Sequence, residues 1–553
     1  MKPMKEFSAL IIDEDPVIHQ LLHNCLMDIG VGFVNTAQNA FYAVRRCEEV
    51  TFDIIFVSFN VKSDKDGFHL LEELKFKGHI TKSTTVIFLS AETDPSLVHC
   101  VVEMQPSDFW VKPLVPKRVE QRLKHIFAVK EKLHKLHYCV DVEEFSSAVY
   151  LAEQFTKKPD LKHYFPNIKR LKGECLFHLF EYEEAELYYK ALLKEYDFGW
   201  VHVGLIQSLL AQHKLDEVEP LVEKLKERED TKFLMYDTMA RYYIEQEEYQ
   251  LAYEEIKTAT QLAPRNIDRN KKSSDLARLN HDRMGQFMAA QNVAKYARNS
   301  VHDSPELRLN VIRSGVDLAT TLGDNEARVI LRKAERIYKE LEEEFGAKIQ
   351  DQLNICKVRM MTLAQDKDGA EKLLKEKVSK EPGASVEDNL DKVKAFHELG
   401  HREDSLRILE KVKEQIGGDT WSSKVVNEYI EQEQIERKEI HFTAKELGEM
   451  AKTHFKEKRL KPAYTNLTQA FKLSPNNPQL SMSLLRVMTA LVEKEKEALD
   501  DFQKDLASEC IAILAASNLD DENAKKLDSY AKILGVDMSN MEKNTSEAES
   551  QDG

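Results

Sequence analysis

Five short apolar segments between residues 8 and 130 alternate with amphipathic segments, and this alternation constrains the fold more than any other feature. Segments such as "SALIID" and "TTVIFLS" are nearly continuous apolar runs, which are typical of strands buried on both faces of a parallel sheet. The segment "PVIHQLLHNCLMDIG" begins at Pro16 and ends at Gly30, as helices favour. Right-handed connections between such β–α pairs predict an α/β domain with a five-stranded parallel sheet covered by helices on both faces.

Beyond about residue 130 the strand signal stops and amphipathic helices follow one another. Two windows, which begin "MARYYIEQEEY" and "MAKTHFKEKRL", resemble tetratricopeptide repeats (TPRs), in which two helices approach closely through small residues. A weaker match lies within residues 173–189. We therefore expect an all-α, TPR-like helical-repeat solenoid after the first domain. The positions that carry the resemblance are Ala240, Tyr243, Ala252, Ala259, Pro264, Ala451, Ala463, Ala470 and Pro475.

Polar residues stand at the ends of the expected strands. Asp13 and Glu14 follow the first strand, Ser90 ends the fourth, and Lys112 precedes a proline after the fifth. In this order the N-terminal domain resembles the receiver domain of two-component response regulators, which has the flavodoxin-like CheY fold. The resemblance implies that the two acids and an acceptor aspartate hold Mg²⁺, while the lysine neutralises the transferred phosphoryl group. It also implies that Ser90 turns toward the phosphate and that the aromatic ring of Phe109 follows.

Ser58, at the end of "FDIIFVS", stands where the family has its acceptor aspartate. A neutral hydroxyl removes one anionic metal ligand and the nucleophile together, and serine attacks poorly without a neighbouring base. Asp53 lies at the other end of the same strand, roughly 16 Å away. Asp64 and Asp66 in the next loop are geometrically conceivable acceptors. The sequence favours a degenerate pseudo-receiver that folds but is not phosphorylated in the usual way.

The remaining pocket residues have a plainer interpretation beside the chemical one. Lys112 is expected to pair structurally with Asp13 or Glu14. Ser90 is expected to be an end-of-strand hydroxyl, and Phe109 a packing residue. The acids themselves also suit a solvated turn before a helix, where the helix dipole favours negative charge. With only two acidic ligands, any Mg²⁺ binding would be weak, and no other cofactor is expected.

The composition excludes several classes of function. A formal net charge of −16 argues against nucleic-acid binding, which needs a basic face. The 7 cysteines show no CxxC pairing, so neither a zinc site nor a disulfide framework is indicated. No apolar run approaches the roughly 20 residues of a membrane helix, and no signal peptide is evident, so we expect a cytoplasmic protein. No catalytic constellation is found, so we expect no enzymatic activity.

The chain is expected to have four segments. These are a receiver-like domain (1–128), a connecting helix or linker (129–150), a TPR-like helical-repeat domain (151–540) and a disordered acidic tail (541–553).

Three functions fit this organisation. The first is a non-enzymatic adaptor in phosphorelay signal transduction, in which the degenerate receiver docks on a sensor histidine kinase or another response regulator while the repeats bind protein partners. In this arrangement the chain resembles the VieB-type auxiliary response regulators. The second is a response regulator that uses a displaced acceptor and has the repeats as its output. The third is a structural scaffold in which the receiver fold forms a homodimer.

Overall fold

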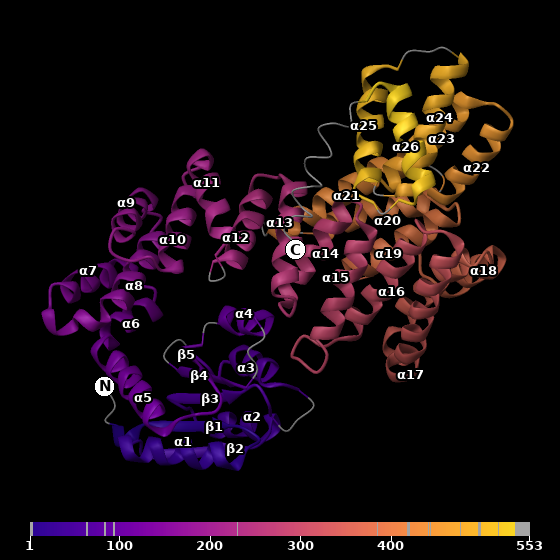
Figure 1. The fold of residues 1–553 in the computed structure, drawn as a ribbon. Helices are drawn as coiled ribbons and strands as arrows, with labels where there is room; N and C mark the ends of the chain where they lie inside the picture. Colours follow the sequence, from indigo (N-terminus) through magenta and orange to yellow (C-terminus); the bar gives the residue numbers. More distant parts are fainter. Residues whose placement is uncertain are drawn as a thin grey trace. The chain divides into compact units, whose positions relative to one another are not determined.

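The computed structural model describes residues 4–61, 65–81, 84–91, 95–104, 106–228, 231–383, 385–416, 421–440, 442, 444–475, 477–495, 499–517 and 519–536 (Figure 1). The chain divides into two compact units. Unit 1 comprises residues 1–270 and 292–303, and unit 2 comprises residues 271–291 and 304–553. The division passes through helices α14 (Ile267–Leu279) and α15 (Arg283–Tyr296).

The first part of unit 1 is an α/β domain built on a five-stranded parallel sheet (Figure 1). The strand order β2-β1-β3-β4-β5 is that of flavodoxin-like folds. The central strands β1, β3 and β4 are buried along their whole length, as their apolar runs predict. The sequence prediction of this sheet is therefore confirmed. The strands are β1 (Ser8–Ile12), β2 (Phe33–Ala37), β3 (Ile54–Ser58), β4 (Thr85–Ser90) and β5 (Asp108–Val111).

Five helices cover this sheet, and two separate core clusters lie on its faces. Helices α1 and α5 pack on one face through residues such as Leu22 and Leu123. Helices α2, α3 and α4 pack on the other face through residues such as Ala43, Leu71 and Leu97. The helices are α1 (Pro16–Ile29), α2 (Ala40–Glu49), α3 (Gly67–Phe76), α4 (Pro95–Glu103) and α5 (Pro116–Lys132), and a short 3-10 segment, η1 (Met4–Glu6), precedes β1.

In the described residues of the rest of unit 1, the secondary-structure elements are all helices. Tyr189 of α9 is buried between α8 and α10, where Gly173 and Gly204 carry no side chain. A Cβ atom on Gly173 would lie 2.4 Å from the Tyr189 hydroxyl oxygen, and one on Gly204 would lie 2.2 Å from the ring. These glycines therefore let three helices meet around one aromatic side chain. The helices are α6 (His134–Asp141), α7 (Phe145–Thr156), the 3-10 segment η2 (Pro159–Tyr164), α8 (Phe165–His178), α9 (Tyr182–Leu192), α10 (Gly199–Leu210), α11 (Leu215–Lys226), α12 (Lys232–Glu245) and α13 (Tyr249–Leu262).

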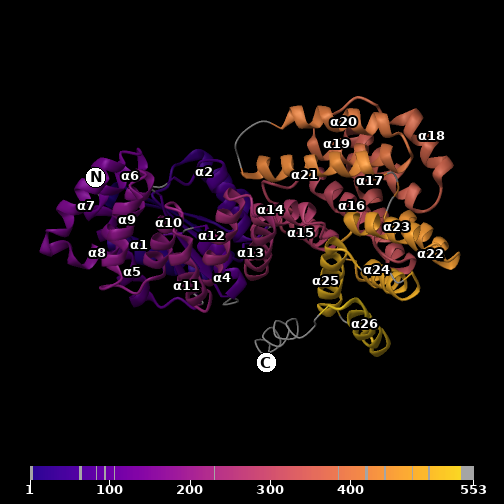
Figure 2. The same ribbon diagram turned by 90° about the horizontal axis from the view of Figure 1, so that it is seen from above.

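In the described part of unit 2 the secondary-structure elements are all helices. The longest helix, α17, is kinked at Ile349, where φ is −125° and ψ is 26°. Helices α22 and α23 lie side by side in both views (Figures 1 and 2). Besides parts of α14 and α15, the elements are α16 (Pro305–Ala319), α17 (Asp324–Leu363), α18 (Lys367–Lys377), α19 (Val386–Glu398), α20 (Arg402–Gln415), α21 (Trp421–Glu439), α22 (Ala444–Lys456), α23 (Leu460–Leu473), α24 (Pro478–Ala490), the π-helical η3 (Leu491–Glu495), α25 (Asp501–Ala515) and α26 (Asp521–Leu534).

The predicted change from an α/β domain to helical structure is confirmed, and the TPR positions fall in the helix pairs α12–α13 and α22–α23. Ala451 and Ala463 belong to one buried cluster that joins α22 to α23. Tyr243 is half-buried, while Pro264 and Pro475 follow the second helix of each pair. Whether these pairs are TPRs stays a prediction. The other four alanines, Ala240, Ala252, Ala259 and Ala470, are buried.

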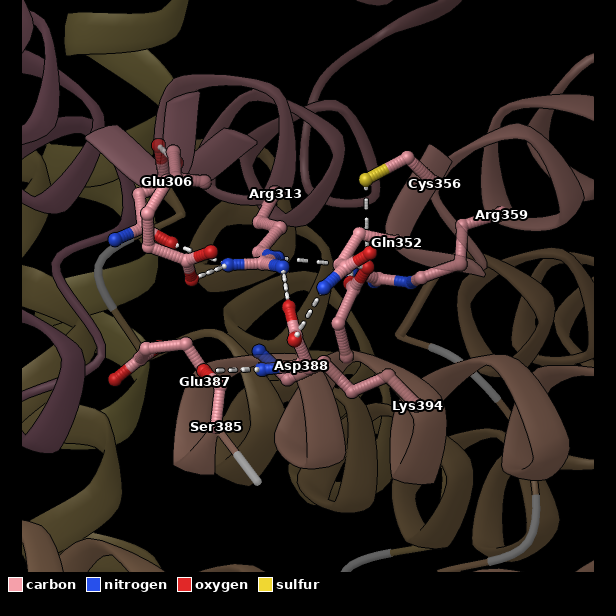
Figure 3. Close-up of polar contacts among 12 residues, drawn as sticks. Glu306, Arg313, Gln352, Cys356, Arg359, Ser385, Glu387, Asp388 and Lys394 are labelled. Atoms are coloured by element: carbon pink, nitrogen blue, oxygen red, sulfur yellow. Dashed lines mark hydrogen bonds and ion pairs between the residues drawn. The ribbon is translucent and has the colours of Figure 1, made fainter. Parts of the chain in front are cut away.

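A network of buried ion pairs joins α16, α17 and α19 in unit 2 (Figure 3). Arg313 of α16 pairs with Asp388 of α19, which also accepts a hydrogen bond of 3.1 Å from Gln352. Arg359 of α17 is only 2% exposed. Because buried charges need partners, removing one of these cations would take a counter-charge from several carboxylates at once. The guanidinium group of Arg359 lies 2.8 Å from Asp317, 2.7 Å from Asp391 and 2.7 Å from Glu398.

Candidate functional site

The candidate site lies at the carboxyl edge of the sheet, because parallel strands bring the residues at their ends together there. Asp13 directly follows β1, Ser58 is the last residue of β3, Ser90 is the last residue of β4, and Lys112 directly follows β5. The backbone N–H of Lys112 donates to the carbonyl of Ser90 (2.8 Å), which ties the end of β5 to that of β4.

Lys112 makes the central contacts of this site. Its ammonium nitrogen lies 2.7 Å from Asp13 Oδ2 and donates to Ser58 Oγ at 3.0 Å. Asp13 and Ser58 are almost fully buried, with 0% and 1% of their surface exposed. The second carboxylate oxygen of Asp13 accepts the backbone N–H of Asp15 at 3.0 Å. The structure therefore places three of the sequence-predicted residues within one hydrogen-bonded group, and the lysine pairs with Asp13 rather than Glu14.

The other predicted residues lie around this group. Ser90 is buried, with 1% of its surface exposed. The ring of Phe109 stacks on Phe88 at 6.0 Å between centroids and an interplanar angle of 9°, so it contributes to packing. Glu14 is exposed and lines an open cavity of about 410 Å³. Asp66 lines the same cavity.

The three other aspartates considered as acceptors differ in their positions. Asp53 precedes β3 and accepts hydrogen bonds from the backbone and side chain of Ser8, at the opposite edge of the sheet. Asp64 lies outside the described residues. Asp66 caps the start of α3 by accepting the backbone N–H of His69 at 3.0 Å. Its other carboxylate oxygen lies 2.8 Å from Arg265, so the carboxylate of Asp66 already has partners.

No sequence motif indicated Arg265, although its side chain contacts the segment that follows Ser58. Its guanidinium group lies 5.4 Å from the ring centroid of Phe59, the residue after Ser58, and 5.8 Å from that of Tyr296. Burial opposes ionisation of Asp66, but His69 and Arg265 hold the pKa of its carboxyl below the ordinary value. The helical part of unit 1 thus contacts the edge of the candidate site.

A second set of contacts extends this interface along α3 and α4. Arg269 is 4% exposed, pairs with Glu103 of α4 and lies 3.1 Å from Asp237. Asn266 donates to Glu103 at 3.0 Å. His302 lies 3.2 Å from a carboxylate oxygen of Glu72 on α3. Arg265 and Arg269 follow directly after a TPR-like window, and in the sequence nothing distinguishes them from solvated charges.

His69 adds to the contacts that Arg265 makes with Asp66 and Tyr296. Its Nδ1 lies 2.9 Å from Asp66 and its Nε2 lies 2.7 Å from the carbonyl oxygen of Tyr296. Both partners only accept hydrogen bonds, so both contacts are made by the protonated ring. Burial lowers the pKa of His69, but Asp66 and the Tyr296 carbonyl outweigh it and raise the pKa above the ordinary value.

The residues at this edge fit Mg²⁺ poorly. Magnesium requires oxygen ligands in near-octahedral geometry, usually including one or two carboxylates. Both oxygens of Asp13 already accept contacts, one from Lys112 and one from the backbone, and Ser58 supplies no charge. In the described part of the chain, no group of three or more His, Cys, Asp or Glu residues is arranged to hold a metal ion.

Comparisons with known proteins identify the class of the N-terminal domain. Residues 9–124 match the family model described as the response regulator receiver domain. The transcriptional regulatory protein LytR of Staphylococcus aureus is 29% identical over 126 residues, which cover 22% of this chain and 48% of LytR. The chain thus spans about half the length of the curated relatives it matches. Residues 9–124 are a CheY-like receiver domain of the kind found in two-component response regulators.

Solved structures similar to this chain include the chemotaxis response regulator CheY4 of Vibrio cholerae, with 23% identity, a TM-score of 0.20 and coverage of 22% of this chain and 98% of that one. A two-component response regulator from Clostridium difficile is also 23% identical, with a TM-score of 0.20 and coverage of 22% and 97%. No described helix has the length and apolar character needed to cross a membrane.

Proposed function

We propose that this chain is a non-enzymatic adaptor of two-component signalling. Its receiver domain docks on a sensor histidine kinase or on another response regulator without accepting a phosphoryl group, and its helical region binds protein partners as a TPR-like array. The observation that carries the proposal is the position of Lys112, whose ammonium nitrogen lies 2.7 Å from Asp13 and 3.0 Å from Ser58.

This arrangement opposes phosphorylation for two chemical reasons. Ser58 Oγ accepts a hydrogen bond from a cation, and a serine hydroxyl becomes a good nucleophile only when a base removes its proton. Asp13 already compensates the charge of Lys112, so this charge is not free to stabilise a phosphoryl group. The contacts of Lys112 therefore support a structural role for it and a pseudo-receiver role for the domain.

Exposed valines beside the candidate site support a docking surface for a partner. Val17 at the start of α1 is 68% exposed, Val111 at the end of β5 is 49% exposed, and Val115 before α5 is 57% exposed. Helices α1 and α5 pack on the same face of the sheet and both begin at its carboxyl edge. Exposed apolar side chains gathered at one edge favour an apolar partner surface, such as a kinase helix pair.

A binding and competition experiment tests this proposal. The full chain is incubated with sensor histidine kinases and their response regulators, and phosphoryl transfer from each labelled kinase is followed. We expect one kinase to bind the chain without labelling it and to transfer more slowly to its own regulator. Val17→Glu and Val115→Glu should each weaken binding at least tenfold, because a buried carboxylate would face an apolar partner.

Phe41→Glu is the matched control, since Phe41 is 69% exposed on α2, which covers the other face of the same sheet. This variant should bind the kinase as the native chain does. Equal losses in all three variants, or direct labelling of the native chain by a kinase, would refute the adaptor role.

A further inference from the structure

A groove of about 370 Å³ lies between α22, α24 and the turn that connects α16 to α17, all within unit 2. Pockets that hold ligands typically have volumes of roughly 300–1,000 Å³, so this groove is large enough for one or two side chains. Phe455 and Leu480 line it, and both are only partly buried against the core of unit 2. The guanidinium group of Arg486 lies 4.8 Å from the ring centroid of Phe455, so the groove presents apolar surface directly beside a cation.

Gly448 contributes to this open space. It lies inside α22 and lines the groove, and a Cβ atom placed on it would meet its nearest neighbour, Leu480, at an ordinary contact distance of 3.8 Å. A glycine inside a helix destabilises it by about 1 kcal/mol relative to alanine. Packing does not require a glycine here, because a larger side chain would have room. The glycine instead keeps the groove open.

The rim of the groove is mostly cationic. Lys445, Lys452 and Lys456 of α22 and Arg486 of α24 line it, whereas Glu449 is its one acidic lining residue among the described residues. Glu449 pairs with Lys452 at 2.7 Å, which leaves an excess of positive charge in a chain of net charge −16.

The spacing of these cations indicates the form of the ligand. Lys445 and Lys456 are separated by eleven positions of one helix, or roughly 16 Å at 1.5 Å per residue. One carboxylate or phosphate group cannot contact both ends of such a row. A run of about five extended residues covers this length.

We propose that this groove binds an acidic peptide segment of a partner protein. One apolar side chain of the segment rests on Phe455 and Leu480, and carboxylates on either side of it pair with Lys456 and Arg486. The inference rests on the proposed protein-binding role of the helical region and adds to it a location and a chemical class of partner.

A peptide selection on the full chain tests this site. A library of random twelve-residue peptides is displayed and selected on the native protein, and the enriched peptides are synthesised with a fluorescent label. We expect aspartate and glutamate to flank an apolar residue in the enriched sequences. Binding measured by fluorescence anisotropy should weaken as salt concentration rises, because charge pairs at the surface are screened.

Two glycine variants separate filling of the groove from effects on folding. Gly448→Leu places an apolar side chain in the groove and should reduce peptide affinity at least tenfold without lowering the melting temperature. Gly346→Leu is the matched control, because Gly346 is also inside a helix with its nearest neighbour at 3.8 Å and lies outside the lining of the groove. This control should bind peptides as the native chain does.

The inference is overturned if the enriched peptides are neutral or basic, or if Gly448→Leu binds them as tightly as the native chain. If laurate displaces the peptides and binds as tightly as they do, the groove is a site for an anion with a single charged group. That result would also overturn the inference. None of these readouts uses a kinase, so failure of receiver docking and failure of this site are distinguishable.

Discussion

Replacing Lys112 with methionine should destabilise the receiver domain by about 3 kcal/mol, the lower end of the range for breaking a buried ion pair. Asp13 is 0% exposed and would lose its counter-charge, the ammonium group 2.7 Å away. It would keep one neutral hydrogen bond, from the backbone N–H of Asp15 at 3.0 Å. The lower end of the energy range applies because the lysine side chain is 17% exposed, so water reaches the ion pair.

Native-state hydrogen exchange of the amides in β1 and β3 measures this free energy within the intact chain. A second change, Asp13→Asn, removes the carboxylate charge that Lys112→Met leaves unpaired. The double variant should therefore recover most of the stability lost in Lys112→Met. The two changes should therefore be strongly non-additive. Unchanged protection of β1 and β3 in Lys112→Met, or additive losses in the double variant, would refute the structural role of this lysine.

Three further predictions concern other parts of the molecule. Arg359→Met should destabilise unit 2 by about 3–5 kcal/mol in chemical denaturation, because Asp317, Asp391 and Glu398 each lose one counter-charge in a largely buried network; the exposed pair of Arg336 makes Arg336→Met a control that should change little. Gly204→Ala should destabilise unit 1 by about 1–3 kcal/mol, since its Cβ would overlap the ring of Tyr189, and a stability equal to that of the native chain would contradict this packing. The pKa of His69 is raised in the folded state, so its stabilising contacts are fully present below about pH 6.5 and are lost as pH rises through the folded pKa. Exchange protection of residues 292–303, corrected for intrinsic rates, should fall over this interval in the native chain but not in His69→Gln.

The sequence was sufficient to predict the receiver fold and the positions of its edge residues. Continuous apolar strands such as β3 can only be buried on both faces, and the parallel arrangement then brings Asp13, Ser58 and Lys112 together. Charge predicted that Lys112 pairs with Asp13 or Glu14, and the structure selects Asp13, which is buried, whereas Glu14 is exposed.

The contacts of charged residues in the helical region could not be predicted in this way. On α19, Asp388, Asp391 and Lys394 recur three residues apart, which is also the pattern of a solvated helix face. In the structure they are 9%, 4% and 8% exposed, because α16 and α17 supply matching charges from distant parts of the sequence. Arg265 and Arg269 pose the same difficulty. Their partners, Asp66 and Glu103, lie 199 and 166 positions earlier in the chain, respectively.

Intact-mass spectrometry after incubation with acetyl phosphate and Mg²⁺ tests the central claim most directly. The native chain should gain no hydroxylamine-labile phosphoryl group, because Ser58 offers a hydroxyl where an acyl phosphate needs a carboxylate. Ser58→Asp restores that carboxylate beside Asp13 and Lys112 and should gain a labile adduct that depends on Mg²⁺. A labile adduct on the native chain would contradict the account.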